Sequence, residues 1–275
     1  MLIYQLTNTT AYQMMCYVIK TNNGKVIVID GGNHGQEREL YRVLTNVGKS
    51  VDLWILTHIH SDHFGAIIDL LDNHKDIVIK RFIRNNQAAA VIASLAGEDL
   101  ADYEEWVKYE KRITLPFEEI KRGESITIDN VKVECLSYGN DDILVNNPNN
   151  QSIVFRISDD DFSMIFLGDL GAEGGTKLVN EYGDKLKADA VQMAHHGQSG
   201  VKRDVYEKIH PQYAFWPTPR WLWDNTPYLG GEKGKGTFQT PEVIKWMDSL
   251  KCKNITSFKK TIVFKTEEKK IYEDV

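Results

Sequence analysis

Three histidines and one aspartate stand within a short stretch of this chain. They form the array His58-x-His60-x-Asp62-His63, which directly follows the apolar run 53–56. Imidazole and carboxylate groups are good ligands for zinc and similar divalent ions, and an array of this kind offers ligands to two ions at once. Two ions about 4 Å apart can activate a water molecule and position an electrophile against it. The spacing therefore predicts a dinuclear metallohydrolase, in which Asp62 also orients the attacking water.

Four apolar segments of the sequence each run into a short polar loop. The loops begin at Asp30, at the histidine array, at Gly168-Asp169 and at His195. Continuous apolar runs of this kind are typical of strands that are covered on both faces. Because α/β folds place their sites just beyond the ends of such strands, we expect the four loops to converge. The four segments span residues 25–29, 52–57, 163–167 and 190–194.

Helices are expected between these strands. Residues 37–47 carry apolar side chains on one helical face, and a second helix is expected over 64–71, with Ser61 or Asp62 as its cap. Residues 87–113 are rich in Ala, Glu and Lys and predict a helical insertion. The chain is therefore predicted to form one α/β domain over residues 1–275, a four-layer αββα sandwich made of two similar halves. Further strands are expected at 132–136, 152–157, 213–216, 255–258 and 261–264.

With its four loops in this order, the sequence resembles the metallo-β-lactamase superfamily. The histidine array matches the signature of that family, Gly168-Asp169 its bridging aspartate motif, His195-His196-Gly197 its late histidine motif, and Asp30-Gly31-Gly32 its early turn. The resemblance implies the metallo-β-lactamase fold and metal-dependent hydrolysis. Through the His-His-Gly motif and residues 149–154, the chain also resembles the metallohydrolase module of bacterial competence (DNA-uptake) channel proteins, without their membrane segments.

The resemblance implies two divalent ions, with zinc as the first choice and manganese or iron as alternatives. Many dinuclear members carry another histidine between the array and the bridging aspartate, whereas here only His74 stands in that interval, at an expected helix end. The first ion is therefore expected to be weakly held, and completed by water or by an amide of residues 149–152. The expected ligands are His58 and His60 for the first ion, Asp62, His63 and His195 for the second, and Asp169 as the bridge.

Two further residues are expected beside the ions. Asp30 is interpreted as accepting a hydrogen bond from a ligating imidazole, with a plain turn residue as the alternative. His196 is interpreted as the acid that protonates the leaving group, and its alternatives are a supporting contact or a ligand role in place of His195. This choice assumes extended backbone, in which successive side chains point in opposite directions.

Two further parts of the sequence are candidates for contact with the substrate. Asn150 and Ser152 are expected near the first ion or the substrate. Residues 216–228 are unusually aromatic and are followed by a basic, glycine-rich stretch at 230–236. Such a segment can stack on a ring while Arg220 meets a phosphate. A core aromatic cluster or a homodimer contact is the alternative interpretation.

The bulk composition narrows the class of protein. A net charge of −6 over 275 residues argues against broad binding of nucleic acid. An anionic small-molecule or nucleotide-like substrate stays possible in this scheme, because two divalent ions make the local field positive. The absence of a long apolar run or a secretory signal, together with three widely spaced cysteines, predicts a cytoplasmic protein with buried free thiols and no membrane segment.

Three functions follow from these features. The first hypothesis is hydrolysis of a phosphodiester or other phosphoester. The second is hydrolysis of a carboxylic ester, a thioester or a lactam by the same ions. The third is a metal-poor binding module without catalytic activity.

Overall fold

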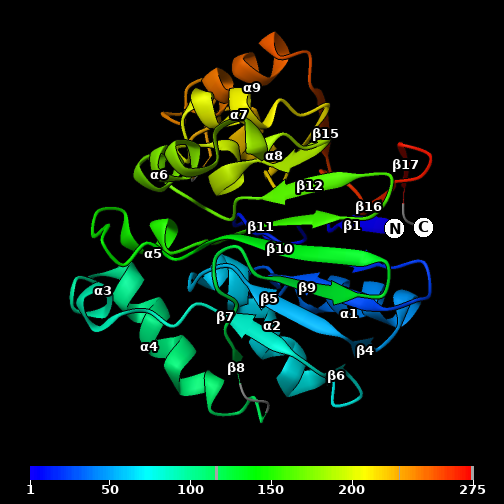
Figure 1. Ribbon diagram of the computed structural model, residues 1–275. Helices are drawn as coiled ribbons and strands as arrows, with labels where there is room; N and C mark the ends of the chain where they lie inside the picture. Colours follow the sequence, from blue (N-terminus) through cyan, green and yellow to red (C-terminus); the bar gives the residue numbers. More distant parts are fainter. Residues whose placement is uncertain (115–116, 229, 274–275) are drawn as a thin grey trace.

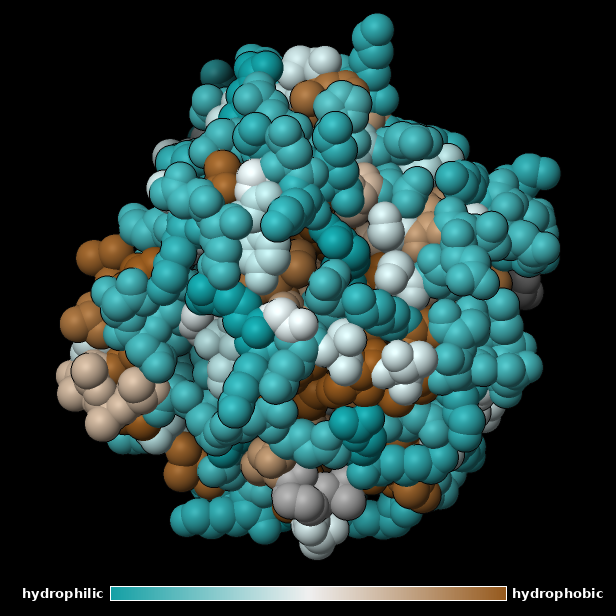
Figure 2. All heavy atoms as spheres, in the orientation of Figure 1, coloured by the Kyte–Doolittle hydropathy of each residue, from teal (hydrophilic) through white to brown (hydrophobic). Residues whose placement is uncertain are grey.

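Two β-sheets face each other in the middle of the domain, and helices cover the outer face of each sheet (Figure 1). This computed structural model describes residues 1–114, 117–228 and 230–273. The arrangement is the expected αββα sandwich. Hydrophilic side chains dominate the face of the molecule seen in Figure 2, and hydrophobic ones show only in patches between them.

The first sheet has eight strands in the order β17-β16-β1-β2-β3-β5-β7-β8, and a two-stranded sheet of β4 and β6 lies beside it. Neighbours from β3 to β8 are parallel, and the remaining neighbours are antiparallel. The strands are β1 (Leu2–Gln5), β2 (Tyr17–Lys20), β3 (Val26–Ile29), β4 (Ser50–Val51), β5 (Leu53–Leu56), β6 (Val78–Ile79), β7 (Phe82–Arg84), β8 (Phe117–Glu118), β16 (Ile262–Lys265) and β17 (Lys270–Glu273). The helices on this side are α1 (Glu37–Val47), α2 (Ser61–Asn73), α3 (Ala89–Ala93) and α4 (Glu98–Glu110).

The second sheet has seven strands in the order β15-β14-β13-β12-β11-β10-β9, and its neighbours from β12 to β15 are parallel. The strands are β9 (Ser125–Ile128), β10 (Val131–Tyr138), β11 (Ile153–Ser158), β12 (Ser163–Phe166), β13 (Ala190–Gln192), β14 (Tyr213–Trp216) and β15 (Lys253–Thr256). The helices on this side are α5 (Asn147–Asn150), α6 (Ala172–Tyr182), α7 (Arg203–Ile209), α8 (Arg220–Trp223) and α9 (Thr240–Ser249), with the short 3₁₀ turns η1 (Gly183–Leu186) and η2 (Ala194–Gly197).

The apolar strands contribute side chains to two hydrophobic cores, one on each face, as their continuous apolar pattern predicts. In β3, Ile27 and Ile29 point into the core between the sheets, whereas Val26 and Val28 point into the core under α1 and α2. Side chains alternate between the faces of a strand, so a strand covered on both sides needs apolar residues at every position. The same burial on both faces holds for β5.

The helix after the histidine array begins earlier than expected. Ser61 and Asp62 lie inside α2, and His60 precedes it as the N-cap residue, so neither Ser61 nor Asp62 caps the helix. The free backbone N–H of Ser61 instead donates to Oδ2 of Asp102, at 2.9 Å. A carboxylate from the distant helix α4 therefore satisfies a donor that a side-chain cap normally satisfies.

Three other expectations concern the helical insertion, the cysteines and membrane segments. The expected helical insertion at 87–113 contains α3 and α4. Cys16, Cys135 and Cys252 are buried free thiols, as predicted. Among the described residues, no helix is both long and apolar enough to cross a bilayer.

Candidate metal centre

The loops that follow β3, β5, β12 and β13 meet at one edge of the two sheets. The N–H of Gly31 donates to the carbonyl of His63 at 2.7 Å, which joins the first loop to the start of α2. The N–H of His195 donates to the carbonyl of Gly168 at 3.1 Å, which joins the last two loops. The convergence expected from the strand ends is therefore present.

Four side chains from these loops form a compact group of possible metal ligands. One ligand atom from each of Asp62, His63, Asp169 and His196 lies within 4.8 Å of the other three. Nε2 of His196 is 3.0 Å from Oδ2 of Asp62 and 3.3 Å from Oδ2 of Asp169. Nε2 of His63 is 3.3 Å from the same oxygen of Asp169. We call these four residues the inner group.

The inner group contains buried polar atoms that satisfy one another poorly. Within the described part of the chain, Oδ2 of Asp62, Nε2 of His63, Oδ1 of Asp169 and Nε2 of His196 have no hydrogen-bond partner. These nitrogen and oxygen atoms are therefore close together, but their angles do not suit hydrogen bonds. Buried polar atoms are rarely left unpaired, and two imidazoles with two carboxylates are a good donor set for a divalent ion. The residues fit a metal.

Both inner-group imidazoles are held by their other nitrogen. Nδ1 of His63 donates to Oδ2 of Asp30 at 2.7 Å, and Nδ1 of His196 donates to the carbonyl of Pro217 at 2.9 Å. Asp30 in turn accepts from the N–H and the hydroxyl of Thr57, at 2.7 and 2.9 Å. Because Nδ1 is the donor in each case, Nε2 is the nitrogen that faces the centre, and it can bind an ion once its own proton is lost. This is the contact expected for Asp30.

His58 and His60 form a second pair of candidate ligands beside the inner group. Nε2 of His58 lies 3.0 Å from Nδ1 of His60, and the rings of His58 and His63 are 4.2 Å apart. Burial and the nearby charge of His63 lower the pKa of His58 well below its usual range, so this imidazole is neutral. Nε2 of His60 contacts Oδ1 of Asp99 at 3.1 Å.

Buried charges shift the pKa values of the inner group. Burial by itself would lower the pKa of His196, but the carboxylates of Asp169 and Asp62 outweigh it and raise this pKa to about 10. Burial would raise the pKa of Asp169, but the charges of His196 and His63 hold it well below the usual range. Protons on the imidazoles therefore balance the carboxylates, and a divalent ion has to displace those protons.

The positions of the two late histidines differ from the expectation. His196 belongs to the inner group and its side chain is fully buried, whereas the side chain of His195 is 18% exposed, with Nε2 4.0 Å from Oδ2 of Asp169. The expectation assumed extended backbone at this point. Strand β13 instead ends at Gln192, and both histidines have left-handed φ values of 50° and 53° within η2, so strand alternation does not apply.

The glycine that follows is required by this turn. Gly197 has φ +78°, and a Cβ at this position would lie 2.4 Å from ring atoms of Trp216. A left-handed φ favours glycine, and the contact with the indole ring leaves no room for a methyl group. The late His-His-Gly motif is thus partly a packing requirement.

A model of the metallo-β-lactamase superfamily matches residues 9–211 of the chain. The chain belongs to this superfamily. It is also similar to two solved structures, each at low sequence identity. The first is the metallo-β-lactamase fold protein YhfI from Bacillus subtilis, with 11% identity, a TM-score of 0.57, and coverage of 96% of this chain and 100% of that one.

The second is a point mutant of CmlA, a diiron β-hydroxylase from Streptomyces venezuelae, with 13% identity and a TM-score of 0.56. This match covers 93% of the present chain and 52% of CmlA. At these identities the two structures support the fold and no particular reaction. No curated protein matches the chain.

Two other candidate residues, Ser152 and Asn150, have structural partners of their own. Oγ of Ser152 accepts the backbone N–H of Asp169 at 3.0 Å and so positions that candidate ligand. Oδ1 of Asn150 accepts the N–H groups of Gly171 and Gly174, both at 3.1 Å, at the start of α6. The Asn150 amide thus supports a helix and its oxygen is already occupied, whereas Oδ1 of Asn149 is buried without a hydrogen-bond partner among the described residues.

Arg220 does not line the cleft that contains Asp62 and His195. Its Nε lies 2.7 Å from Oδ2 of Asp224, and its guanidinium stands 5.3 Å from the ring centre of Phe258. The expected meeting of this side chain with a substrate phosphate therefore has no support here.

Several residues at the site were missed by the sequence analysis. Thr57 links Asp30 to the histidine array, and its position between a buried strand and the array is a signal that was available. Gln192 is fully buried, and its Oε1 accepts the N–H groups of Leu167 and Gly168, both at 2.8 Å. Asp99 and Asp102 of α4 carry no local signal, because their partners lie far away in sequence.

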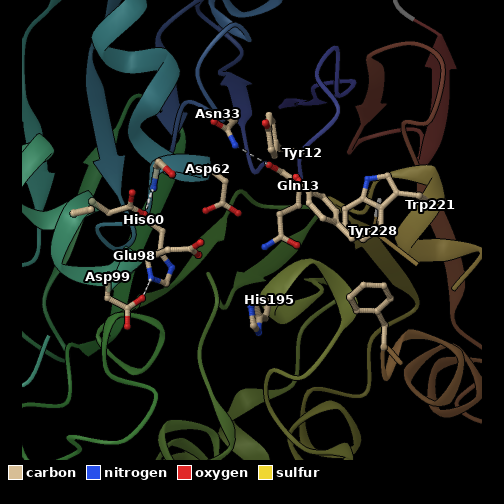
Figure 3. A pocket seen from close by; sticks show the side chains of 14 residues that line it. Tyr12, Gln13, Asn33, His60, Asp62, Glu98, Asp99, His195, Trp221 and Tyr228 are labelled. Carbon is tan, nitrogen blue, oxygen red and sulfur yellow. Dashed lines mark hydrogen bonds and ion pairs between the residues drawn. The ribbon is translucent and has the colours of Figure 1, made fainter. Parts of the chain in front are cut away.

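A cleft of about 660 Å³ opens beside the centre (Figure 3). Asp62 and His195 stand in its middle, with His60, Glu98 and Asp99 on one side and Trp221 and Tyr228 on the other. Its volume is typical of small-molecule sites. The full lining is Tyr12, Gln13, Asn33, His60, Ser61, Asp62, Glu98, Asp99, Ala101, Asp102, His195, Trp221, Tyr228 and Phe238.

Proposed function

We propose that this chain is a metal-dependent hydrolase that cleaves a phosphodiester or another phosphoester. The observation that carries the hydrolase assignment is the inner group: four clustered ligand side chains, each with a buried polar atom that has no hydrogen-bond partner among the described residues, beside a cleft large enough for a small molecule. We take zinc as the first metal to test, with manganese and iron as alternatives.

Each group of residues has its own role in metal binding under this proposal. The inner group would hold one ion, and His58 with His60 would hold a second, with Asp169 as a ligand that both could share. Bound divalent ions would supply an activated water and stabilise the negative charge that develops on the substrate. Asp30 and the carbonyl of Pro217 keep the Nδ1 protons of His63 and His196 in place, so that both Nε2 atoms stay free.

His195 is our choice for the proton donor to the leaving group. Its side chain lines the cleft, is 18% exposed, and has an Nδ1 atom without a hydrogen-bond partner among the described residues. A group that exchanges a proton with a substrate must reach it from the site. His196 is fully buried, so it serves better as a ligand.

Two points support a phosphoester. The late His-His-Gly motif and residues 149–154 resemble the hydrolase module of competence channel proteins. Two divalent ions would also attract a phosphate and polarise its oxygens. A carboxylic ester, thioester or lactam is the second candidate, because among the described residues that line the cleft none is Lys or Arg.

The test is a substrate panel on metal-loaded protein: bis-p-nitrophenyl phosphate, a thioester and nitrocefin, with the bound metal measured in the same samples. Our proposal expects at least one equivalent of metal and turnover of the phosphodiester, lost in His196→Ala and Asp169→Asn. His210→Asn is the matched control, since His210 is exposed and asparagine tolerates its left-handed φ of 48°. Metal below one equivalent together with no turnover would instead favour a non-catalytic binding module.

A further inference from the structure

The cleft has two unlike walls. One wall is aromatic and consists of Tyr12, Trp221, Tyr228 and Phe238. The rings of Trp221 and Tyr228 meet edge to face at 5.0 Å, Phe238 stands 5.4 Å from Trp221, and Tyr12 stands 6.1 Å from Tyr228. Because each ring touches a neighbour, the four form one continuous surface. We call it the aromatic wall.

The opposite wall is acidic and comes from the first turns of α4. It carries Glu98, Asp99 and Asp102. Asp99 contacts His60 and Asp102 accepts the N–H of Ser61. Among the described contacts the carboxylate of Glu98 has no hydrogen bond or ion pair, so it is available to a ligand in the cleft. We call these three residues the acidic wall.

Glu98 and Asp99 lie on the opposite side of Asp62 and His195 from Trp221 and Tyr228 (Figure 3). Burial raises the pKa of Tyr228, and the charges of Tyr12 and Glu98 raise it further, so Glu98 acts on Tyr228 across the cleft. Between the walls, Oδ2 of Asp62 is buried and has no hydrogen-bond partner in the described chain. This oxygen lies 3.0 Å from Nε2 of His196 in the inner group, so the space between the walls ends at the candidate metal centre.

The basic groups near the aromatic wall do not balance this charge. Arg220 and Lys233 both pair with Asp224, at 2.7 and 2.9 Å, and neither lines the cleft. A cleft with carboxylates on one side and aromatic faces on the other suits a cation, because the ring faces and the carboxylates both attract positive charge.

We propose that the substrate carries a cationic ammonium group, which sits between the aromatic wall and Glu98 while its ester bond lies at Asp62 and His195. The inference rests on the proposed function for the reaction, and on the two walls alone for the charge of the ligand. It places the substrate among small zwitterionic or cationic esters, and it excludes long polyanions from this cleft.

The first experiment measures binding without turnover. Choline and its uncharged isostere 3,3-dimethylbutanol are titrated into the full-length protein by calorimetry, with and without bound zinc. We expect choline to bind at least tenfold more tightly than the isostere, and Glu98→Gln and Trp221→Leu each to reduce that preference at least threefold. Glu104→Gln is the control on the same helix, since Glu104 is exposed and does not line the cleft. Equal affinities for the two probes, or binding of neither, would overturn the inference.

The second experiment measures turnover of two matched esters, p-nitrophenyl phosphorylcholine and p-nitrophenyl 3,3-dimethylbutyl phosphate. We expect kcat/KM to favour the choline ester at least tenfold, and the preference to shrink in Glu98→Gln but not in Glu104→Gln. Equal hydrolysis of both esters overturns the cationic substrate and leaves the hydrolase proposal intact. Selective choline binding without hydrolysis of either ester supports the cation site and overturns the hydrolase proposal.

Discussion

Nε2 of His60 lies 3.1 Å from Oδ1 of Asp99, a residue on a helix outside the histidine array. A carboxylate at this distance keeps the imidazole proton on Nε2, so Nδ1 of His60 accepts a hydrogen bond from Nε2 of His58 at 3.0 Å. Helix α4 therefore positions a candidate ligand from outside, and it also forms the acidic wall of the cleft.

Replacing Asp99 should weaken the metal site at His58 and His60. Loss of a carboxylate that orients a ligating histidine typically costs about 10–100-fold in metal affinity. We expect Asp99→Ala to weaken the second equivalent of Co²⁺ by about this factor, while the first equivalent at the inner group is retained. A cobalt titration followed by visible absorption measures both steps. With Glu104→Gln as the control, an unchanged second step in Asp99→Ala would show that Asp99 does not position His60.

The two late histidines should differ in their effect on metal binding. We expect His196→Ala to weaken the tightest metal site at least 100-fold, because its Nε2 lies within the inner group. His195→Ala should leave that affinity within about threefold and lower kcat instead. Calorimetric titration with zinc distinguishes the two variants. If His195→Ala proves the more damaging to metal affinity, the ligand assignment must be reversed.

Metal binding should stabilise the fold. A ligand that binds only the folded state at 100 times its Kd adds about 2.7 kcal/mol, which for a domain of this size raises Tm by roughly 5–10 °C. We expect this rise on adding zinc to chelator-treated protein, measured by calorimetry. Asp169→Asn should lose most of the rise, and His210→Asn should keep it. A Tm that does not change when zinc is added would argue against a metal site in the folded protein.

Metal binding should release protons at neutral pH. In the metal-free protein the pKa of His196 is raised to about 10, so its imidazole is charged below that pH. A ligating imidazole must be neutral, so each binding event displaces this proton, and apparent affinity rises with pH until about pH 10 is passed. Zinc titrations in buffers of different ionisation enthalpy, at about pH 7 and 8, count the protons released. Affinity that is independent of pH in this range would contradict the charged state of His196.

The turn at Gly197 should tolerate no side chain. We expect Gly197→Ala to destabilise the protein by roughly 2–4 kcal/mol, because a left-handed φ costs a non-glycine residue about 1–2 kcal/mol and the contact with Trp216 adds to it. Gly123→Ala is the matched control, with φ +82° and nothing within 4 Å of the added Cβ. Urea unfolding of both variants separates the two costs. Equal losses would mean that the Trp216 contact is relieved by a small shift.

Local patterns determined the strands and the set of ligand types. The continuous apolar runs predicted strands buried on both faces, and β3 and β5 have that burial because every second residue faces a different core. The polar loops after these runs were expected to converge, and they do, because parallel neighbours end at the same edge. These features depend on residues close together in the chain, so they can be predicted from one sequence without the structure.

Tertiary structure decided which side chains face the centre. His195 and His196 are adjacent and chemically alike, and only the left-handed turn before Gly197 turns His196 inward. Asp99 and Asp102 act on the array from a separate helix, and Arg220 pairs with Asp224 and does not line the cleft. Each of these outcomes depends on backbone direction or on contacts between distant segments. Residue type and spacing encode neither the backbone direction nor these distant contacts, so the tertiary packing decides them.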